Sequence, residues 1–250
     1  MRKILSYVHP FSLLFMLSGS ALGWWITHEL IHPEAALFFL YVALSVSGGV
    51  IYLQGVLAAK GGTRLVVGLL LDGVFHITGA WAALCVFMPL MFFQNLTIST
   101  KLLCALAVLL FLLFNIHVSL QSAKVLWQRY GSGVFINHLN IDDSSVDWEK
   151  VARAMSAHRN VVPVGAPRRW HSIISKIIYA FAVAGLYLAG LYSVFAVVSW
   201  AVPAIIVAGV MLQYASHSFF QAHSVWAWQR SSGTILKSAP FRSRKKRKSR

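Results

Sequence analysis

The chain contains six runs of predominantly apolar residues, each close to the length of a membrane-crossing helix. The hydrocarbon core of a bilayer requires about 20 apolar residues per helical span. The runs cover residues 11–28, 36–59, 65–93, 102–123, 177–197 and 200–226. Short connections between most of them favour antiparallel neighbours. The pattern predicts an all-α polytopic integral membrane protein, with six transmembrane helices in three antiparallel hairpins.

The basic residues predict the orientation of these helices. When the N-terminus, with Arg2 and Lys3, is placed in the cytoplasm, all of the 22 Lys and Arg residues except Lys101 fall in cytoplasmic segments. Cytoplasmic loops of membrane proteins carry an excess of Lys and Arg. We therefore expect both termini to be cytoplasmic and the membrane to be a bacterial inner (plasma) membrane.

Composition excludes an ordinary soluble domain. Apolar residues make up 58% of the chain and charged residues 12%, against about 25% charged in a typical soluble domain. The net charge of +15 is concentrated in loops and in the tail 242–250. Such a tail beside a final span predicts contact with anionic lipid headgroups rather than with nucleic acid. Cys85 and Cys104 fall inside predicted spans and are expected to pack as small apolar residues.

Four parts are predicted along the chain: a membrane domain of four spans (1–129), a cytoplasmic insert (130–171), two further spans (172–229) and a basic cytoplasmic tail (230–250). In the insert, the sequence from Ser144 to Asp147 predicts a helix start. An amphipathic helix is then expected to about His158. One interpretation lays this helix on the membrane face, and the other makes it a docking site for a cytoplasmic partner.

Aromatic and basic side chains in the insert and the tail are the expected contacts with the membrane surface or with protein partners. These residues are Trp148, Arg168, Arg169, Trp170, Arg244, Lys245, Lys246, Arg247 and Lys248.

Two stretches of the chain resemble each other. His117-x-x-x-Gln121 precedes Trp127-Gln128-Arg129, and His217-x-x-x-Gln221 precedes Trp228-Gln229-Arg230. Common descent of the hairpins would explain this repetition, and so would the general recurrence of Trp and Arg at membrane interfaces.

Small residues within the spans predict close helix contacts. They occur as Gly19-x-x-x-Gly23 in the first run, as Ser45, Ser47, Gly48 and Gly49 in the second, and as Gly185-x-x-x-Ala189 in the fifth.

One string has metal-ligand spacing. His28, Glu29 and His32 form an HExxH, which on a helix places two imidazoles on one face for zinc. Intramembrane metalloproteases of the site-2 type pair such a motif with Leu-Asp-Gly, and Leu71-Asp72-Gly73 is similar to it. The two motifs would lie at different depths, roughly 25 Å and 12 Å from the cytoplasmic ends of their spans. The alternative is a polar outer loop in which Glu29 pairs with a histidine.

A second group of polar residues is predicted inside the membrane. Asp72 and His76 share a face of the third span, and His76, His117 and His217 lie at a similar distance from cytoplasmic arginines. A lipid-facing carboxylate is costly, so these side chains are expected to face the bundle interior. Three interpretations fit: a structural contact between helices, a proton or ion relay, or b-type haem held by two imidazoles.

No Walker loop, Rossmann glycine pattern or Gly-x-Ser-x-Gly is present. The sequence therefore favours a non-enzymatic integral membrane subunit, which scaffolds or anchors a larger inner-membrane assembly such as a secretion, transfer or respiratory complex. The alternative is a haem-binding or proton- or ion-conducting protein that uses the Asp/His cluster.

Overall fold

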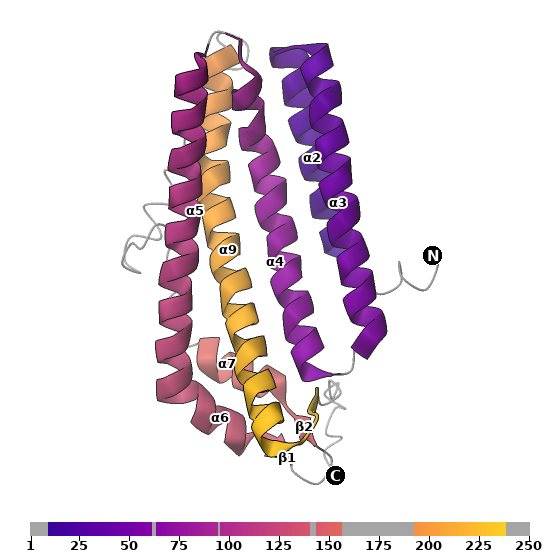
Figure 1. Cartoon of the computed structure of the whole chain (residues 1–250), viewed down its shortest axis with the longest axis vertical. Helices are drawn as coiled ribbons and strands as arrows, with labels where there is room; N and C mark the ends of the chain where they lie inside the picture. Colours follow the sequence, from indigo (N-terminus) through magenta and orange to yellow (C-terminus); the bar gives the residue numbers. More distant parts are fainter. Residues whose placement is uncertain (1–9, 62–63, 95, 141–143, 157–192, 239–250) are drawn as a thin grey trace, which may run out of the picture.

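A computed structural model describes residues 10–61, 64–94, 96–140, 144–156 and 193–238 as a bundle of long helices with a small folded unit at one end (Figure 1). The helices are α2 (Pro10–Leu30), α3 (Pro33–Gly61), α4 (Leu65–Phe87) with its 3-10 extension η1 (Met88–Phe92), α5 (Ile98–Leu126) with the π-helical turn η2 (Trp127–Gly131), α6 (Ser132–Asn137), α7 (Trp148–Ser156) and α9 (Ser193–Ser232).

Four helical segments are long and apolar enough to cross a membrane: Pro33–Ala59, Leu65–Phe92, Ile98–Asn137 and Ser199–Ser232. They contain the runs predicted at 36–59, 65–93 (all but its last residue), 102–123 and 200–226. The run 11–28 forms α2, which is not among these four. Most of the run 177–197 lies outside the described residues, and its end, from Ser193, belongs to α9. The prediction of a helical membrane protein is therefore confirmed to the extent of four possible spans, and the count of six stays a prediction.

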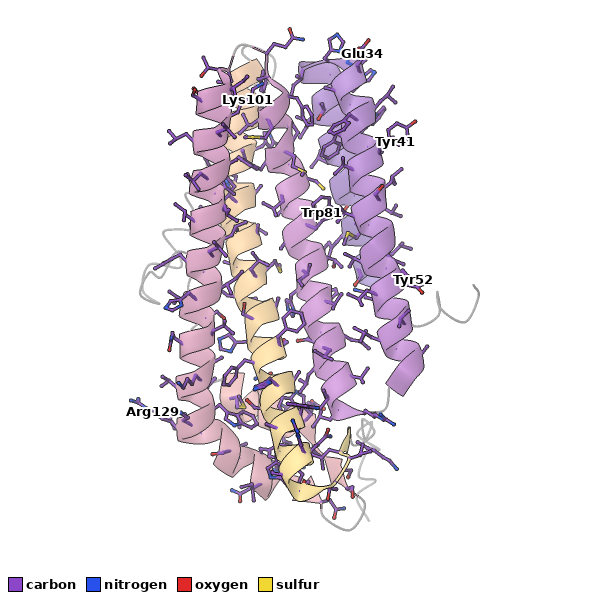
Figure 2. The ribbon with its side chains drawn as sticks, viewed as in Figure 1. Glu34, Tyr41, Tyr52, Trp81, Lys101 and Arg129 are labelled. Carbon is purple, nitrogen blue, oxygen red and sulfur yellow. The ribbon has the colours of Figure 1, made fainter. Side chains whose placement is uncertain are left out.

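Local sequence sets several helix boundaries. Pro33 begins α3, a position where its missing N–H costs nothing, and the turn Ile31-His32 before it connects α2 to α3. Thr97 caps α5, because its side-chain oxygen accepts a hydrogen bond from the Thr100 N–H at 3.2 Å. Lys101 lies at this end of the bundle and Arg129 at the other (Figure 2). The basic-residue pattern requires this separation, while the identity of the cytoplasmic end stays a prediction.

Helices α4 and α9 form the centre of the bundle, with α2 and α3 on one side and α5 on the other (Figure 1). Glycines allow the closest approaches. A Cβ built on Gly19 of α2 would lie 2.5 Å from the Ala82 Cα of α4. A Cβ on Gly73 of α4 would lie 2.6 Å from the Phe219 ring of α9. These seams therefore depend on the absence of a side chain at these glycines.

A small unit covers one end of the bundle; we call it the cap. It consists of α6, α7 and the strands β1 (Leu139–Asn140), β2 (Ser145–Val146) and β3 (Lys237–Ser238). The strand order is β1-β2-β3, with β1 antiparallel and β3 parallel to β2. The cap is tied to α4, because the Leu65 N–H donates to the Leu236 carbonyl at 3.1 Å.

The cap and the helix ends share one apolar core. Its buried residues are Leu65, Leu69, Leu126, Phe135, Val146, Val151, Met155, Ala222, Val225 and Leu236. Residues predicted to belong to separate parts of the chain, the insert and the C-terminal segment, thus fold together on the end of the bundle.

The helix start in the insert differs from the prediction at Ser144. Ser144 has a left-handed backbone (φ 51°), and Ser145–Val146 form β2, so the helix begins only at Trp148. Asp147 is the cap, since its Oδ1 accepts from the Lys150 N–H at 3.3 Å. Cross-strand pairing thus takes the residues that a longer helix would need. The predicted end near His158 lies outside the described residues.

The apolar face of α7 packs onto the end of the bundle. Val151 and Met155 are buried in the shared core, and Trp148 is half-buried against it. This burial accounts for the helical spacing of the apolar residues in α7 without requiring that they face lipid.

Candidate functional site

The main polar site lies between α4 and α9. The Ser218 hydroxyl of α9 donates to Asp72 Oδ2 of α4 at 2.5 Å. Ser218 is buried, whereas the Asp72 side chain keeps 53% of its surface exposed. The carboxylate is therefore held by a partner on the neighbouring helix, at the edge of the seam rather than inside it.

His76 completes this site one turn along α4. Its Nδ1 lies 2.8 Å from the Asp72 backbone carbonyl oxygen and 3.8 Å from Asp72 Oδ2. A carbonyl oxygen only accepts, so Nδ1 carries the proton and Nε2 is the acceptor in the neutral ring. The ring stacks on Tyr214 of α9, with centroids 5.2 Å apart and planes 17° apart. Two side chains of α4 thus meet two of α9.

The chemistry of this site favours helix–helix contact. In a Ser-His-Asp triad, the imidazole lies between the hydroxyl and the carboxylate. Here the Ser218 hydroxyl is bonded to Asp72 directly, and His76 donates to a backbone oxygen. The arrangement provides no base for Ser218 of the triad type, and it joins α4 to α9.

The other two histidines of the predicted cluster lie elsewhere. His117 is exposed on the surface of α5, and His217 is fully buried on α9. Axial haem ligation needs two imidazoles directed at the same iron. Because His117 faces outward and His76 stacks on Tyr214, these two do not fit such a pair. The structure brings together Asp72 and His76, and adds Ser218 and Tyr214, which sequence reasoning missed.

A second polar site joins α5 to α9 and was also missed. Gln213 Nε2 donates to Asn115 Oδ1 at 2.6 Å, and the Ser119 hydroxyl donates to the Gln213 backbone carbonyl oxygen at 2.7 Å. All three side chains are buried. Polar side chains of this kind hold transmembrane helices together. The signal available in the sequence was the presence of two amide side chains, Asn115 and Gln213, inside apolar runs.

The predicted metal string is divided between two structural elements. His28 and Glu29 lie in the last turn of α2, which ends at Leu30, and His32 lies in the following turn. His28 Nδ1 is 3.1 Å from Glu29 Oε1, while His32 Nδ1 accepts from the Glu34 N–H at 3.2 Å. In the described part of the chain, no three His, Cys, Asp or Glu side chains gather in a way that could hold a metal ion.

The repeated Trp-Gln-Arg stretches meet in the cap. Trp127 and Trp228 both pack against Phe135, with ring centroids 5.8 Å and 5.5 Å apart. These two tryptophans contribute to the cap core rather than anchoring at its surface. The two repeats differ at the histidines that precede these tryptophans, because His117 is exposed and His217 is buried.

The remaining predicted contacts are only partly described. Trp148 packs against the cap core. Arg168, Arg169 and Trp170 of the insert lie outside the described residues, as do Arg244, Lys245, Lys246, Arg247 and Lys248 of the tail.

No protein-family model, curated protein or solved structure matches this chain.

Proposed function

We propose that this chain is a non-enzymatic integral membrane subunit that scaffolds or anchors a larger inner-membrane assembly, such as a secretion, transfer or respiratory complex. The observation that carries the proposal is the cap. The insert and the C-terminal segment are joined there by β2 and β3, and they share one core with the ends of α4, α5 and α9. A folded unit fixed to a helix bundle presents a surface of constant shape to a partner.

The exposed surface of the cap supports this role. Ile136 of α6 and Ile235, just before β3, keep 58% and 56% of their surface exposed. The cap also carries the exposed ion pairs Asp147–Lys150, at the start of α7, and Glu149–Arg153, within it. Apolar side chains among charged neighbours are typical of contact surfaces between proteins.

The use of polar groups between helices supports a non-enzymatic role. Gln213 bonds to Asn115, Ser218 bonds to Asp72, and Gln54 donates to Ser12 at 3.1 Å. Each of these bonds joins two helices. Polar groups that serve helix packing are not directed at a substrate, so this chemistry is that of an assembly component.

The test is site-specific photo-crosslinking in native membranes. A photoreactive residue at Ile136 or Ile235 should give discrete protein adducts of one or a few masses. The photoreactive residue placed at Val151, which is fully buried, should give no adduct with another protein. Placed at Leu113, on the exposed surface of α5, it reports contacts within the lipid. The proposal requires that the adducts at the cap disappear when the partner identified in them is deleted.

Two results would contradict the proposal. The first is a full-length protein that gives no adduct at either cap position in native membranes. The second is an activity of the isolated chain: ion flux in liposomes, or a Soret absorbance band that is lost with His217→Ala. The second result would favour the conducting or haem-binding alternative.

A further inference from the structure

Three side chains on the exposed surface of α9 form a ladder beside the cap. The Arg230 guanidinium carbon lies 5.6 Å from the centre of the Trp226 ring, and the Trp226 ring centre lies 5.8 Å from that of His223. His223 and Arg230 are exposed, and Trp226 keeps 46% of its surface exposed. Ala222 and Val225, centred about 100° away around the same turns, are buried in the cap core. The ladder therefore faces away from the protein.

The ladder lies where α9 leaves the apolar part of its span. The possible span begins at Ser199, and about 20 residues cross the hydrocarbon core, which places the boundary near Phe219. His223 and Trp226 follow within about 10 Å of that boundary at 1.5 Å per residue. The zone of lipid headgroups extends about 5–8 Å beyond the hydrocarbon core, so His223 lies within this zone and Trp226 at its outer edge.

Side-chain direction brings Arg230 back toward the same zone. Helical side chains lean toward the N-terminus of their helix, which for α9 is the end opposite the cap (Figure 1). The contacts of Arg230 with Trp226, and of Trp226 with His223, follow this direction. A long basic side chain beside the membrane extends its charge to the interface in this way.

The charge of Arg230 is available for an anion. In the cap, Asp147 is 2.8 Å from Lys150, and Glu149 is paired with Arg153. Within the described ranges of the chain, no carboxylate lies within ion-pair distance of Arg230. Arginine binds phosphate through several N–H groups at once, and tryptophan prefers the membrane interface.

We propose that His223, Trp226 and Arg230 form a binding site for the headgroup of an anionic phospholipid. Arg230 binds the phosphate, Trp226 holds the guanidinium in place and contacts the glycerol region, and His223 borders the site on the membrane side. The inference rests on the proposed insertion of the chain in a membrane, and it is independent of the proposed scaffold role.

The repeated Trp-Gln-Arg stretch supplies a matched control. Arg129 is exposed at the same end of the molecule (Figure 2). The neighbouring tryptophan, Trp127, packs inward against Phe135. In the part of the chain that the structure describes, no aromatic ring lies under Arg129. Removing either arginine changes the net charge equally, but only Arg230 belongs to a ladder.

The experiment is a lipid titration of the full chain in detergent, followed by native mass spectrometry, with phosphatidylglycerol and phosphatidylcholine as probes. We expect the wild type to prefer phosphatidylglycerol. Arg230→Gln should weaken its binding about five-fold, the effect of one basic side chain near a charged membrane surface, whereas Arg129→Gln should leave it unchanged. Trp226→Leu should also weaken binding of phosphatidylglycerol, because the guanidinium loses its support.

Several results would overturn the proposal. Equal losses in Arg230→Gln and Arg129→Gln would mean a diffuse attraction by net charge. Displacement of the lipid by inorganic phosphate at equal concentration would mean a phosphate site, and displacement by a short oligonucleotide would mean a nucleic-acid surface. A different outcome supports the independence of the two proposals: Arg230→Gln loses phosphatidylglycerol binding while its cap adducts persist in the photo-crosslinking test.

Discussion

Gly19 and Gly23 of α2 and Gly48 and Gly49 of α3 lie on neighbouring helices but in opposite surroundings. A Cβ on Gly23 would lie 2.4 Å from the Cys85 carbonyl oxygen and from the Phe39 ring. A Cβ on Gly48 or Gly49 would meet nothing within 4 Å. The first pair belongs to a closed seam, where α2, α3 and α4 meet, and the second to an open face. The same residue type therefore marks a helix contact in one place and an uncovered surface in the other.

The difference shows which contacts stabilise the bundle. In a closed seam, the neighbour is fixed backbone or a packed ring, so a change in volume cannot be absorbed. On an open face, a new side chain displaces no neighbouring part of the protein. Polar contacts follow the same division: the Asn115–Gln213 pair is buried, the Asp72–Ser218 contact lies at an edge, and Asp147–Lys150 lies at the surface. The expected effects of substitution should fall in that order.

The sharpest test exchanges glycine for leucine in each place. Gly19→Leu forces α2 away from the Ala82 backbone and should lower the free energy of unfolding by about 3 kcal/mol or more, at the upper end of overpacking effects. Gly48→Leu should be neutral or slightly stabilising, since it removes the entropy cost of a helical glycine. Thermal unfolding in detergent and in lipid measures both. A similar loss with Gly48→Leu in lipid would show that the face of α3 is covered in the membrane.

The buried amide pair should show the next largest effect. Gln213→Leu or Asn115→Leu leaves the other amide without its bond, at a cost of about 1–3 kcal/mol. The double variant should cost less than the sum, with a coupling energy of about 0.6–1.7 kcal/mol. Gln121→Leu, at an exposed position of α5, is the control and should have little effect. If the two effects are strictly additive, the two amides do not stabilise each other, and their contact does not belong to the closed seam.

The contact at the edge of the seam should matter less. Asp72→Asn keeps an acceptor for the Ser218 hydroxyl and should cost under about 1 kcal/mol, while Ser218→Ala loses the bond and should cost about 1 kcal/mol. Folded yield and unfolding midpoint are the measurements. Failure of Asp72→Asn to fold would mean that the carboxylate charge itself is essential, and Asp72 would then belong with the closed contacts.

The smallest effect is expected at the surface of the cap and depends on pH. The hydrogen bond from the Lys150 side chain holds the pKa of the Asp147 carboxyl below its ordinary value. The stabilisation is therefore present above about pH 4 and is lost as the pH falls through the lowered pKa. The difference in unfolding midpoint between neutral and acidic pH should be slightly larger for the wild type than for Asp147→Asn. An equal or smaller difference would show that the ion pair contributes nothing measurable, as many surface pairs do.

The sequence predicted helix lengths better than helix faces. An apolar run must be about 20 residues long to cross the membrane, so the runs 11–28, 36–59, 65–93 and 102–123 match α2, α3, α4 with η1, and α5 closely. The run 200–226 is shorter than α9 at both ends. Lipid and protein interior are both apolar, so Gly48 and Gly49 could not be distinguished from Gly19 and Gly23. The sequence also does not show which helices are neighbours. Asp72 could therefore be assigned a partner on its own helix, His76, but Ser218 could not be found without knowing that α4 packs against α9.

The cap escaped prediction for a different reason. Its strands have two residues each, too short for a visible alternation, and the partner of Ser145 is Lys237, far along the chain. The depths of Asp72 and His76 were counted from Arg64, which forms an isolated bridge with Lys237 beside the cap sheet. Arg64 is therefore part of a folded contact that the sequence did not reveal, and the depths stay predictions.

The pairing of Ser145 with Lys237, together with the bond from Leu65 to Leu236, joins three stretches of chain that leave the ribosome at different times. During synthesis, Leu65, Val146 and Val151 therefore remain without their final cover until α9 and the residues after it have been made. A nascent chain whose last helix fails to insert would keep this apolar surface exposed to chaperones and proteases. Closure of the cap therefore has to follow the synthesis of α9, Leu236 and Lys237.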